Sequence, residues 1–203
     1  MLSTPAKLID GLIIFRDFKK VFGSIFLFNS NEITAPNPVI CFFKNDEEHQ
    51  LKLIQVIRKY KPDIILCNAI DDRHIDHPRG AKLVIDSCFL SGLKKIVTEY
   101  NNKEQEPWRP LNIYHYIQWK NLKPDFVVDI SNYFNVKIKA VKSFKSQFYN
   151  EKEPIHNTPI STKNFLDSIE YRARDLGRLT NVDYAEGFIS ARLPIIDSIS
   201  VLK

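Results

Sequence analysis

Apolar residues follow two rhythms along the chain, and the two rhythms alternate. Short continuous apolar runs, typical of strands covered on both faces, predict strands over 63–68, 112–117 and 126–130. Longer stretches with an apolar residue every three or four positions predict helices over 45–60, 79–93, 136–149 and 162–179. Strands that alternate with helices indicate an α/β fold, with a Rossmann-like, mainly parallel sheet flanked by helices.

Capping residues and breakers set the ends of the first of these helices. Asn45 or Asp46, followed by Glu48, is the pattern expected where a helix begins. Lys61–Pro62 ends the helix, because proline disfavours a helical conformation in the residue before it. The helix and the strand that follows it over 63–68 therefore begin a repeating strand–helix unit.

Residues 1–41 are the least regular part of the chain. Two apolar runs there, Leu12–Phe15 and Ser24–Phe28, each predict a strand. Residues 101–110 are polar and charged, and they predict a surface connection. With 203 residues and no repeat, low-complexity tract or linker, the chain is expected to form a single domain over 1–203.

Composition and charge exclude several classes of protein. The net charge of +5 is modest and no aromatic platform accompanies the lysines, so no nucleic acid partner is expected. No apolar run approaches the length of a membrane span and the start lacks a signal-peptide pattern, so we expect a cytoplasmic protein with no membrane partner. The three cysteines have no paired spacing and are expected to be reduced, buried thiols: Cys41, Cys67 and Cys88.

The densest group of ionisable residues lies between a predicted strand and a predicted helix. It is the run Cys67–His77, which holds two of the five histidines, His74 and His77, with Asp76 between them. In open α/β sheets the crevice at the carboxyl ends of the strands binds ligands. Imidazole and carboxylate together suit zinc, although two histidines do not complete a zinc site. A solvated loop that is simply charged is the alternative interpretation.

Further motifs place this run in a family context. The run Asn68–His77, with the helix end Cys88–Leu93, resembles the second signature of the LmbE-like (PIG-L-like) zinc-dependent N-deacetylases. It is most similar to the bacillithiol-biosynthesis branch, which removes acetate from N-acetylglucosaminyl-malate. The matching motifs continue in order at 114–119, 123–126, 146–149, 171–177 and 185–188. The resemblance covers 42–203 and implies a deacetylase domain with a small-molecule substrate of the N-acetylglucosamine (GlcNAc) type.

The resemblance also assigns roles to residues of the run. His77 would be a metal ligand, the third protein ligand of one Zn per chain. His74 would stabilise the oxyanion that forms when water attacks the amide carbonyl, and it is a candidate to protonate the leaving amine. Asp76 would orient or charge His74, as a supporting carboxylate does. A turn carboxylate bonded to local backbone is the alternative for Asp76.

Four further residues are candidate substrate contacts. Arg73 suits a substrate carboxylate, because a guanidinium binds a carboxylate in two-pronged fashion. An exposed arginine paired with a neighbouring aspartate is the alternative. His115 and Tyr116 resemble the pocket wall of the family, with half-buried packing as the alternative. Glu186 matches a family position near the mouth of the cleft.

One departure separates the chain from the family. The family opens with a strand followed by Ala-His-Pro-Asp-Asp, which supplies a His and an Asp to the metal and another Asp as general base. No such run occurs in the chain, whose first histidine is His49. Residues 1–41 are therefore unmatched, and we expect this N-terminal portion to be divergent or truncated.

Two hypotheses from different classes follow. The first is a zinc-dependent N-deacetylase, an amide hydrolase that forms a homo-oligomer as the family commonly does. The second is a catalytically inactive family member that acts as a sugar-binding or oligomer-scaffold subunit. A nucleotide-binding domain is disfavoured, because the sequence has no Gly-x-Gly-x-x-Gly or Gly-x-x-x-x-Gly-Lys run.

Overall fold

The computed structural model describes residues 12–14, 44–145, 147–151 and 158–201. The chain divides into two compact units: unit 1 comprises Met1–Lys123 with Ile189–Lys203, and unit 2 comprises Pro124–Phe188. The single domain expected over the whole chain stays a prediction. The strand predicted at Ser24–Phe28 and the thiol of Cys41 lie outside the described residues.

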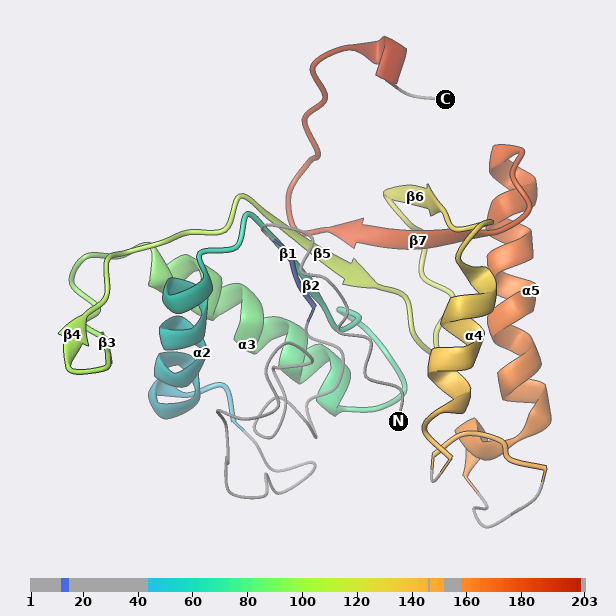
Figure 1. Cartoon of the computed structure of the whole chain (residues 1–203), viewed down its shortest axis with the longest axis horizontal. Coiled ribbons are helices and arrows are strands. Elements are labelled where there is room, and N and C mark those ends of the chain that lie inside the picture. The colour runs from blue at the N-terminus through green and yellow to red at the C-terminus, as the bar shows by residue number, and fades with distance from the viewer. Residues whose placement is uncertain (1–11, 15–43, 146, 152–157, 202–203) are drawn as a thin grey trace. The chain divides into compact units, whose positions relative to one another are not determined.

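Unit 1 is built on three parallel strands in the order β1 (Leu12–Ile14), β2 (Ile64–Cys67) and β5 (Asn112–Tyr116) (Figure 1). Ile14 pairs with Leu66, and Cys67 pairs with His115. These strands confirm three of the sequence predictions to within two residues at each end. Because all three strands run the same way, their carboxyl ends meet at one edge, where the segments that follow β2 and β5 come together.

Two helices, α2 (Glu47–Tyr60) and α3 (Asp76–Ser91), lie side by side against these strands (Figure 1). The core between them is fully buried and consists of Leu53, Ile57, Ile65, Cys67, Leu83, Val84 and Cys88. Asp46 caps α2 as predicted, because its carboxylate accepts the N–H of His49 at 3.1 Å. The α/β fold, Rossmann-like with mainly parallel core strands and flanking helices, is confirmed.

Helix α3 begins three residues before the predicted start at Arg79. Pro78 falls at the third helical position, where the missing N–H has no helical partner to lose. The prediction treated Pro78 as part of the preceding turn, but a proline in the first turn is compatible with a helix. His77 therefore lies on the first turn of α3 and not in a loop before it.

The carboxyl end of α3 is held by Arg58 of α2, which is 2% exposed. Its Nε donates to Ser91 O at 3.0 Å and its Nη2 to Leu93 O at 2.9 Å. Its Nη1 donates to Ile96 O at 2.6 Å and to Thr98 Oγ1 at 2.9 Å. Carbonyls at this end of a helix lack helical donors and carry partial negative charge. The buried guanidinium therefore supplies hydrogen bonds to them and a positive charge at the same time.

The stretch 101–110, predicted to be a surface connection, contributes to a small hairpin. The strands β3 (Glu99–Tyr100) and β4 (Lys103–Glu104) pair in antiparallel fashion. Asn101 and Asn102 between them have φ angles of 53° and 59°. Asparagine tolerates positive φ, and this geometry suits a two-residue hairpin turn. Strands of two residues are too short to show an alternating pattern, so the sequence did not reveal them.

Unit 2 contains the antiparallel strands β6 (Phe126–Asp129) and β7 (Ala185–Ser190), together with the helices α4 (Phe134–Lys142) and α5 (Lys163–Thr180). The last two residues of β7 belong to unit 1. Helix α5 confirms the prediction over 162–179. Thr162 caps it by accepting the N–H of Phe165 at 3.1 Å.

Helix α4 ends at Lys142, seven residues before the predicted end. The hydroxyl of Ser143 donates to Ala140 O at 2.7 Å, and such side-chain bonds compete with the helical ladder. The apolar periodicity continues past this point, but the described residues 143–145 and 147–149 form turns and irregular backbone. Phe148, predicted to face inward on this helix, lies beyond its end and is half-buried, with its ring stacked on Phe165 at 6.0 Å between centroids.

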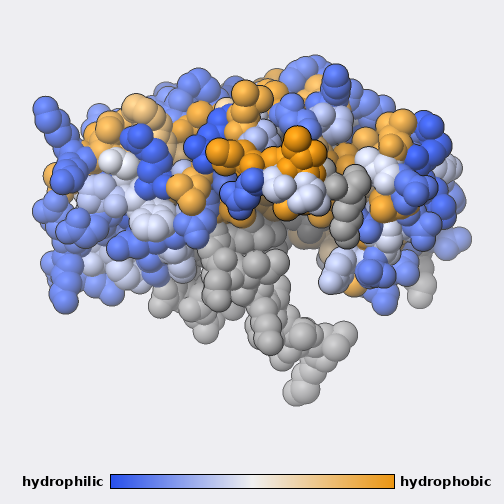
Figure 2. All heavy atoms as spheres, turned by 90° about the horizontal axis from the view of Figure 1, so that it is seen from above, coloured by the Kyte–Doolittle hydropathy of each residue, from blue (hydrophilic) through white to orange (hydrophobic). Residues whose placement is uncertain are grey.

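No helix in the described parts of the chain is long and apolar enough to cross a membrane. Exposed aliphatic side chains occur in the segment after β7, at Leu193, Ile195, Ile199 and Val201. Figure 2 shows hydrophobic side chains on one face as patches among hydrophilic ones. The expected homo-oligomer stays a prediction.

Candidate functional site

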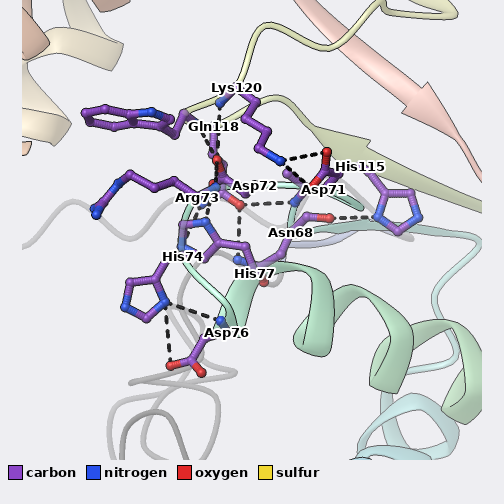
Figure 3. Close-up of polar contacts among 12 residues, drawn as sticks. Asn68, Asp71, Asp72, Arg73, His74, Asp76, His77, His115, Gln118 and Lys120 are labelled. Atoms are coloured by element: carbon purple, nitrogen blue, oxygen red, sulfur yellow. Dashed lines mark hydrogen bonds and ion pairs between the residues drawn. The ribbon is translucent and has the colours of Figure 1, made fainter.

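The predicted polar run lies where the carboxyl edge of the strands meets the first turn of α3 (Figure 3). Residues 68–77, called here the β2–α3 segment, leave β2 and enter α3. Residues 117–120, called the β5 exit, follow β5 at the same edge. Both segments belong to unit 1. Their contacts therefore form within one compact unit.

Asp72 anchors the two segments to each other, and its side chain is fully buried. Its Oδ1 accepts the backbone N–H groups of Arg73 at 2.8 Å, Trp119 at 3.1 Å and Lys120 at 3.2 Å, while Oδ2 pairs with Nδ1 of His77. Burial alone would raise the pKa of this carboxyl. The hydrogen bonds from the imidazole and the backbone outweigh burial and hold the pKa below its usual value. Asp72 is therefore a carboxylate at neutral pH.

His77 is held at both nitrogens of its ring. Nδ1 donates to Asp72, so Nε2 is the unprotonated nitrogen of the neutral ring. Nε2 lies 3.3 Å from the side-chain nitrogen of Gln118, and the side chain of His77 is 29% exposed. A carboxylate on one nitrogen typically fixes the tautomer of a metal-binding histidine and raises the basicity of the other nitrogen. The site therefore offers one imidazole nitrogen as a ligand.

His74 lies beside His77, with ring centroids 5.4 Å apart. Its Nδ1 accepts the backbone N–H of Asp76 at 3.3 Å and lies 3.9 Å from Oδ2 of the same residue. In the neutral form that accepts this bond, Nε2 carries the proton and is a donor. The structure thus brings His74 and Asp76 together, while their catalytic roles stay predictions.

Arg73 stacks its guanidinium on the ring of Trp119, with 4.7 Å from Cζ to the ring centroid. Asp71 pairs with the Lys120 ammonium at 2.7 and 2.9 Å, and the bond from Arg73 to Asp72 comes from its backbone N–H. Among the described residues, the side chain of Arg73 therefore does not pair with a neighbouring aspartate. Stacking occupies the face of a guanidinium and leaves its N–H edge suited to an anion.

His115 and Tyr116 lie on opposite faces of β5, because successive strand residues alternate. His115 is 1% exposed, and its Nδ1 lies 2.7 Å from Asn68 O and 3.2 Å from Cys67 Sγ. Its Nε2 has no hydrogen-bond partner in the part of the chain that the structure describes. Tyr116 is half-buried. The two side chains cannot line the same face, and their substrate-binding role stays a prediction.

The buried imidazole of His115 predicts a pH dependence of stability. Burial lowers its pKa, although the bond to Asn68 O opposes the shift. As the pH falls below the ordinary histidine pKa of about 6.5, the unfolded chain gains a proton that the folded chain does not, so the free energy of unfolding falls by up to about 1.4 kcal/mol per pH unit. Urea unfolding at pH 7.5 and 5.5 should show a shallower loss in His115→Gln than in the wild type. Equal losses would contradict the prediction.

Glu186 lies on β7 in unit 2, where its carboxylate pairs with Lys137 at 2.7 Å. Both side chains are partly exposed, so the pair adds little to stability. This ion pair is a structural reason for the glutamate, and the predicted place at a cleft mouth stays a prediction.

The two described cysteines, Cys67 and Cys88, are buried and free, as predicted. Burial raises the pKa of both thiols. Only a thiolate is a strong nucleophile, so neither residue is a candidate nucleophile.

Three contributors to the site were not singled out as functional from the sequence: Asp72, Gln118 and Trp119. Asp72 looked like one of several loop carboxylates, and its burial depends on N–H groups 47 and 48 residues later. A Gln-Trp pair directly after a predicted strand was the available signal. Polar residues that follow neighbouring parallel strands tend to meet at one edge of the sheet.

The described donor groups do not fit the predicted zinc site by themselves. A catalytic zinc ion commonly has three protein ligands, and the described residues supply one, Nε2 of His77. In the described ranges, no group of three or more His, Cys, Asp or Glu side chains is placed to hold a metal ion. The sequence directly after β1 reads Phe15-Arg16-Asp17, without a histidine. One zinc per chain stays a prediction.

Comparison with solved structures shows that the chain has an α/β fold that known enzymes share. It resembles the conserved protein TT1542 from Thermus thermophilus, with 28% identity and a TM-score of 0.64 over 77% of this chain and 63% of that one. It also resembles the N,N'-diacetylchitobiose deacetylase from Pyrococcus horikoshii, with 23% identity and a TM-score of 0.59 over 76% and 55% of the two chains. A third likeness is GalB, the 4-carboxy-2-hydroxymuconate hydratase from Pseudomonas putida, with 16% identity and a TM-score of 0.55 over 76% and 62%.

The two enzymes are too distant in sequence to show more than the fold. No family model matches the chain. The chain spans less than two thirds of the length of each of the three solved structures. Because a deacetylase and a hydratase share the fold, the choice of reaction depends on the site residues.

Proposed function

We propose that the chain is a hydrolase that removes the acetyl group from an N-acetylglucosaminyl conjugate, with N-acetylglucosaminyl-malate as the first candidate substrate. The observation that carries the proposal is the pair formed by Asp72 and His77, in which a buried carboxylate holds a proton on Nδ1, so that Nε2 is the nitrogen of the neutral ring that can bind a ligand. The resemblance of the β2–α3 segment to the deacetylase signature supports it. So does the fold shared with a deacetylase of an acetylated sugar.

The neighbouring side chains have matching roles in the proposal. His74 donates its Nε2–H to the carbonyl oxygen that gains charge when water attacks, and the loss of such a donor typically costs about 10²–10³ in rate. The guanidinium edge of Arg73 binds a substrate carboxylate while Trp119 supports its face. Nε2 of His77 would hold a zinc ion only together with further ligands, and the chemistry that such an ion would supply is a bound water of lowered pKa.

The small number of metal ligands among the described residues favours a second function. One imidazole does not hold zinc tightly, because affinity comes from several ligands in a fixed geometry. If no further ligand joins His77, the same edge of the sheet keeps Arg73 and Trp119 as binding groups without the catalysis. The chain is then a sugar-binding or scaffold subunit, and it binds the conjugate without releasing acetate.

The test measures zinc per chain and acetate release from N-acetylglucosaminyl-malate for the wild type, His77→Ala and His49→Ala. We expect about one zinc per chain and acetate release in the wild type, with both lost in His77→Ala and on treatment with a chelator. His49 lies in the first turn of α2, outside this segment, and its variant should behave as the wild type. A folded wild type with neither zinc nor acetate release would overturn the proposal, and conjugate binding in that protein would establish the second function.

A further inference from the structure

Gln118 links the β5 exit to the ligand nitrogen of His77. The oxygen of its carboxamide accepts the backbone N–H of Ala69 at 3.0 Å and the side-chain amide of Asn68 at 3.3 Å. Its nitrogen lies 3.3 Å from Nε2 of His77 (Figure 3). One side chain from the end of β5 therefore contacts three residues of the β2–α3 segment.

The contacts fix which end of the carboxamide faces the imidazole. A backbone N–H only donates, so the atom that faces Ala69 must be the oxygen. The NH₂ group then faces Nε2 of His77, and it can donate only if Nε2 is unprotonated. The carboxylate of Asp72 requires a proton on Nδ1, and in the neutral ring that proton leaves Nε2 as the acceptor. Asp72, which follows β2, and Gln118, which follows β5, thus favour the same tautomer of His77.

We propose that Gln118 is a positioning residue, whose carboxamide holds the ring of His77 through a contact at Nε2 and covers that nitrogen until a ligand replaces the carboxamide. This inference rests on the proposed function in one respect only, namely that Nε2 of His77 serves as a ligand. A ligand at Nε2 must displace the NH₂ group, and the same movement releases the bonds to Ala69 and Asn68. Occupancy at His77 is therefore coupled to the position of the β5 exit, which carries Trp119 under Arg73.

Two variants separate positioning from a merely structural role. Gln118→Met keeps the length of the side chain and removes the donor, so Nε2 of His77 is uncovered. Gln118→Glu keeps an acceptor for Ala69 and turns an acceptor toward Nε2, so it favours a proton on that nitrogen. A structural role predicts that both variants change His77 in the same direction, whereas positioning predicts opposite directions.

The experiment measures the rate at which diethyl pyrocarbonate acylates His77, which requires an unprotonated ring nitrogen, with peptide mass spectrometry to assign the site. Relative to the wild type, we expect a rate about fivefold higher in Gln118→Met, the factor of one net hydrogen bond, and a lower rate in Gln118→Glu. His49, in the same molecules, is the internal reference and should react equally in all three proteins.

Equal rates at His77 in the three proteins, or a change of the same sign in both variants, would overturn the proposal. The readout needs neither zinc nor turnover. Failure of the deacetylase function would therefore leave this result intact, and failure of the Gln118 proposal would leave zinc content and acetate release unchanged.

Discussion

Replacing Arg58 by methionine should lower the free energy of unfolding of unit 1 by about 2–4 kcal/mol. Methionine keeps most of the apolar stem, so the loss comes from the four hydrogen bonds at the end of α3. Ser91 O keeps a second donor, the N–H of Trp108, but the partly buried Ile96 O and the buried Thr98 Oγ1 lose the guanidinium. A buried acceptor without a partner costs about 1–3 kcal/mol.

Urea unfolding followed by tryptophan fluorescence measures this loss in unit 1. Both tryptophans of the chain belong to this unit, and Trp108 donates its indole N–H to Pro62 O at 2.8 Å beside the core. Arg58→Lys should fall between the wild type and methionine, since an ammonium cannot reproduce the planar fork. Lys52→Met, an exposed change on the same helix, is the matched control and should have little effect. An unfolding midpoint of Arg58→Met equal to that of the control would contradict the prediction.

Elements with strong local signals were predictable from the sequence. Helix α2 has its cap at Asp46 and its stop at Lys61–Pro62, and β2 is a continuous apolar run, so both were placed to within two residues. Helix α4 was placed too long because the bond of the Ser143 hydroxyl is a local competitor that periodicity does not register. A period describes which residues face inward and not where the backbone leaves the helix.

The site residues likewise differ in how far the sequence predicts their proximity. His74, Asp76 and His77 are close in the sequence, so their proximity was predictable, whereas Gln118 is 41 residues from His77. The register of β5 on β2, with Cys67 opposite His115, brings the two strand ends together, and no local pattern encodes that register. His115 was a candidate because of the family resemblance and its place on a predicted strand, and the alternation of side chains along β5 decided which face it took.

The second large effect is expected for Asp72→Asn, which should reverse the tautomer of His77 and, under the proposed deacetylase function, lower acetate release by about 10²–10⁴. In Asp72, Oδ1 accepts three backbone N–H groups and Oδ2 accepts the imidazole. The asparagine oxygen should stay with the three backbone donors, so the NH₂ group replaces Oδ2 and donates to Nδ1. The proton of the neutral ring then moves to Nε2, which removes its lone pair from any ligand.

Nitrogen-15 NMR of the imidazole distinguishes the two tautomers directly, and zinc content and acetate release report the consequence. Asp71→Asn is the matched control, because Asp71 is an exposed neighbour that pairs with Lys120 and does not touch His77. It should keep the wild-type tautomer and activity. An Asp72→Asn protein that folds, keeps the proton on Nδ1 and still releases acetate at the wild-type rate would show that the carboxylate does not govern His77. In that case the tautomer would have to be set by Gln118 alone, since its NH₂ group is the other contact on the ring that requires an unprotonated Nε2.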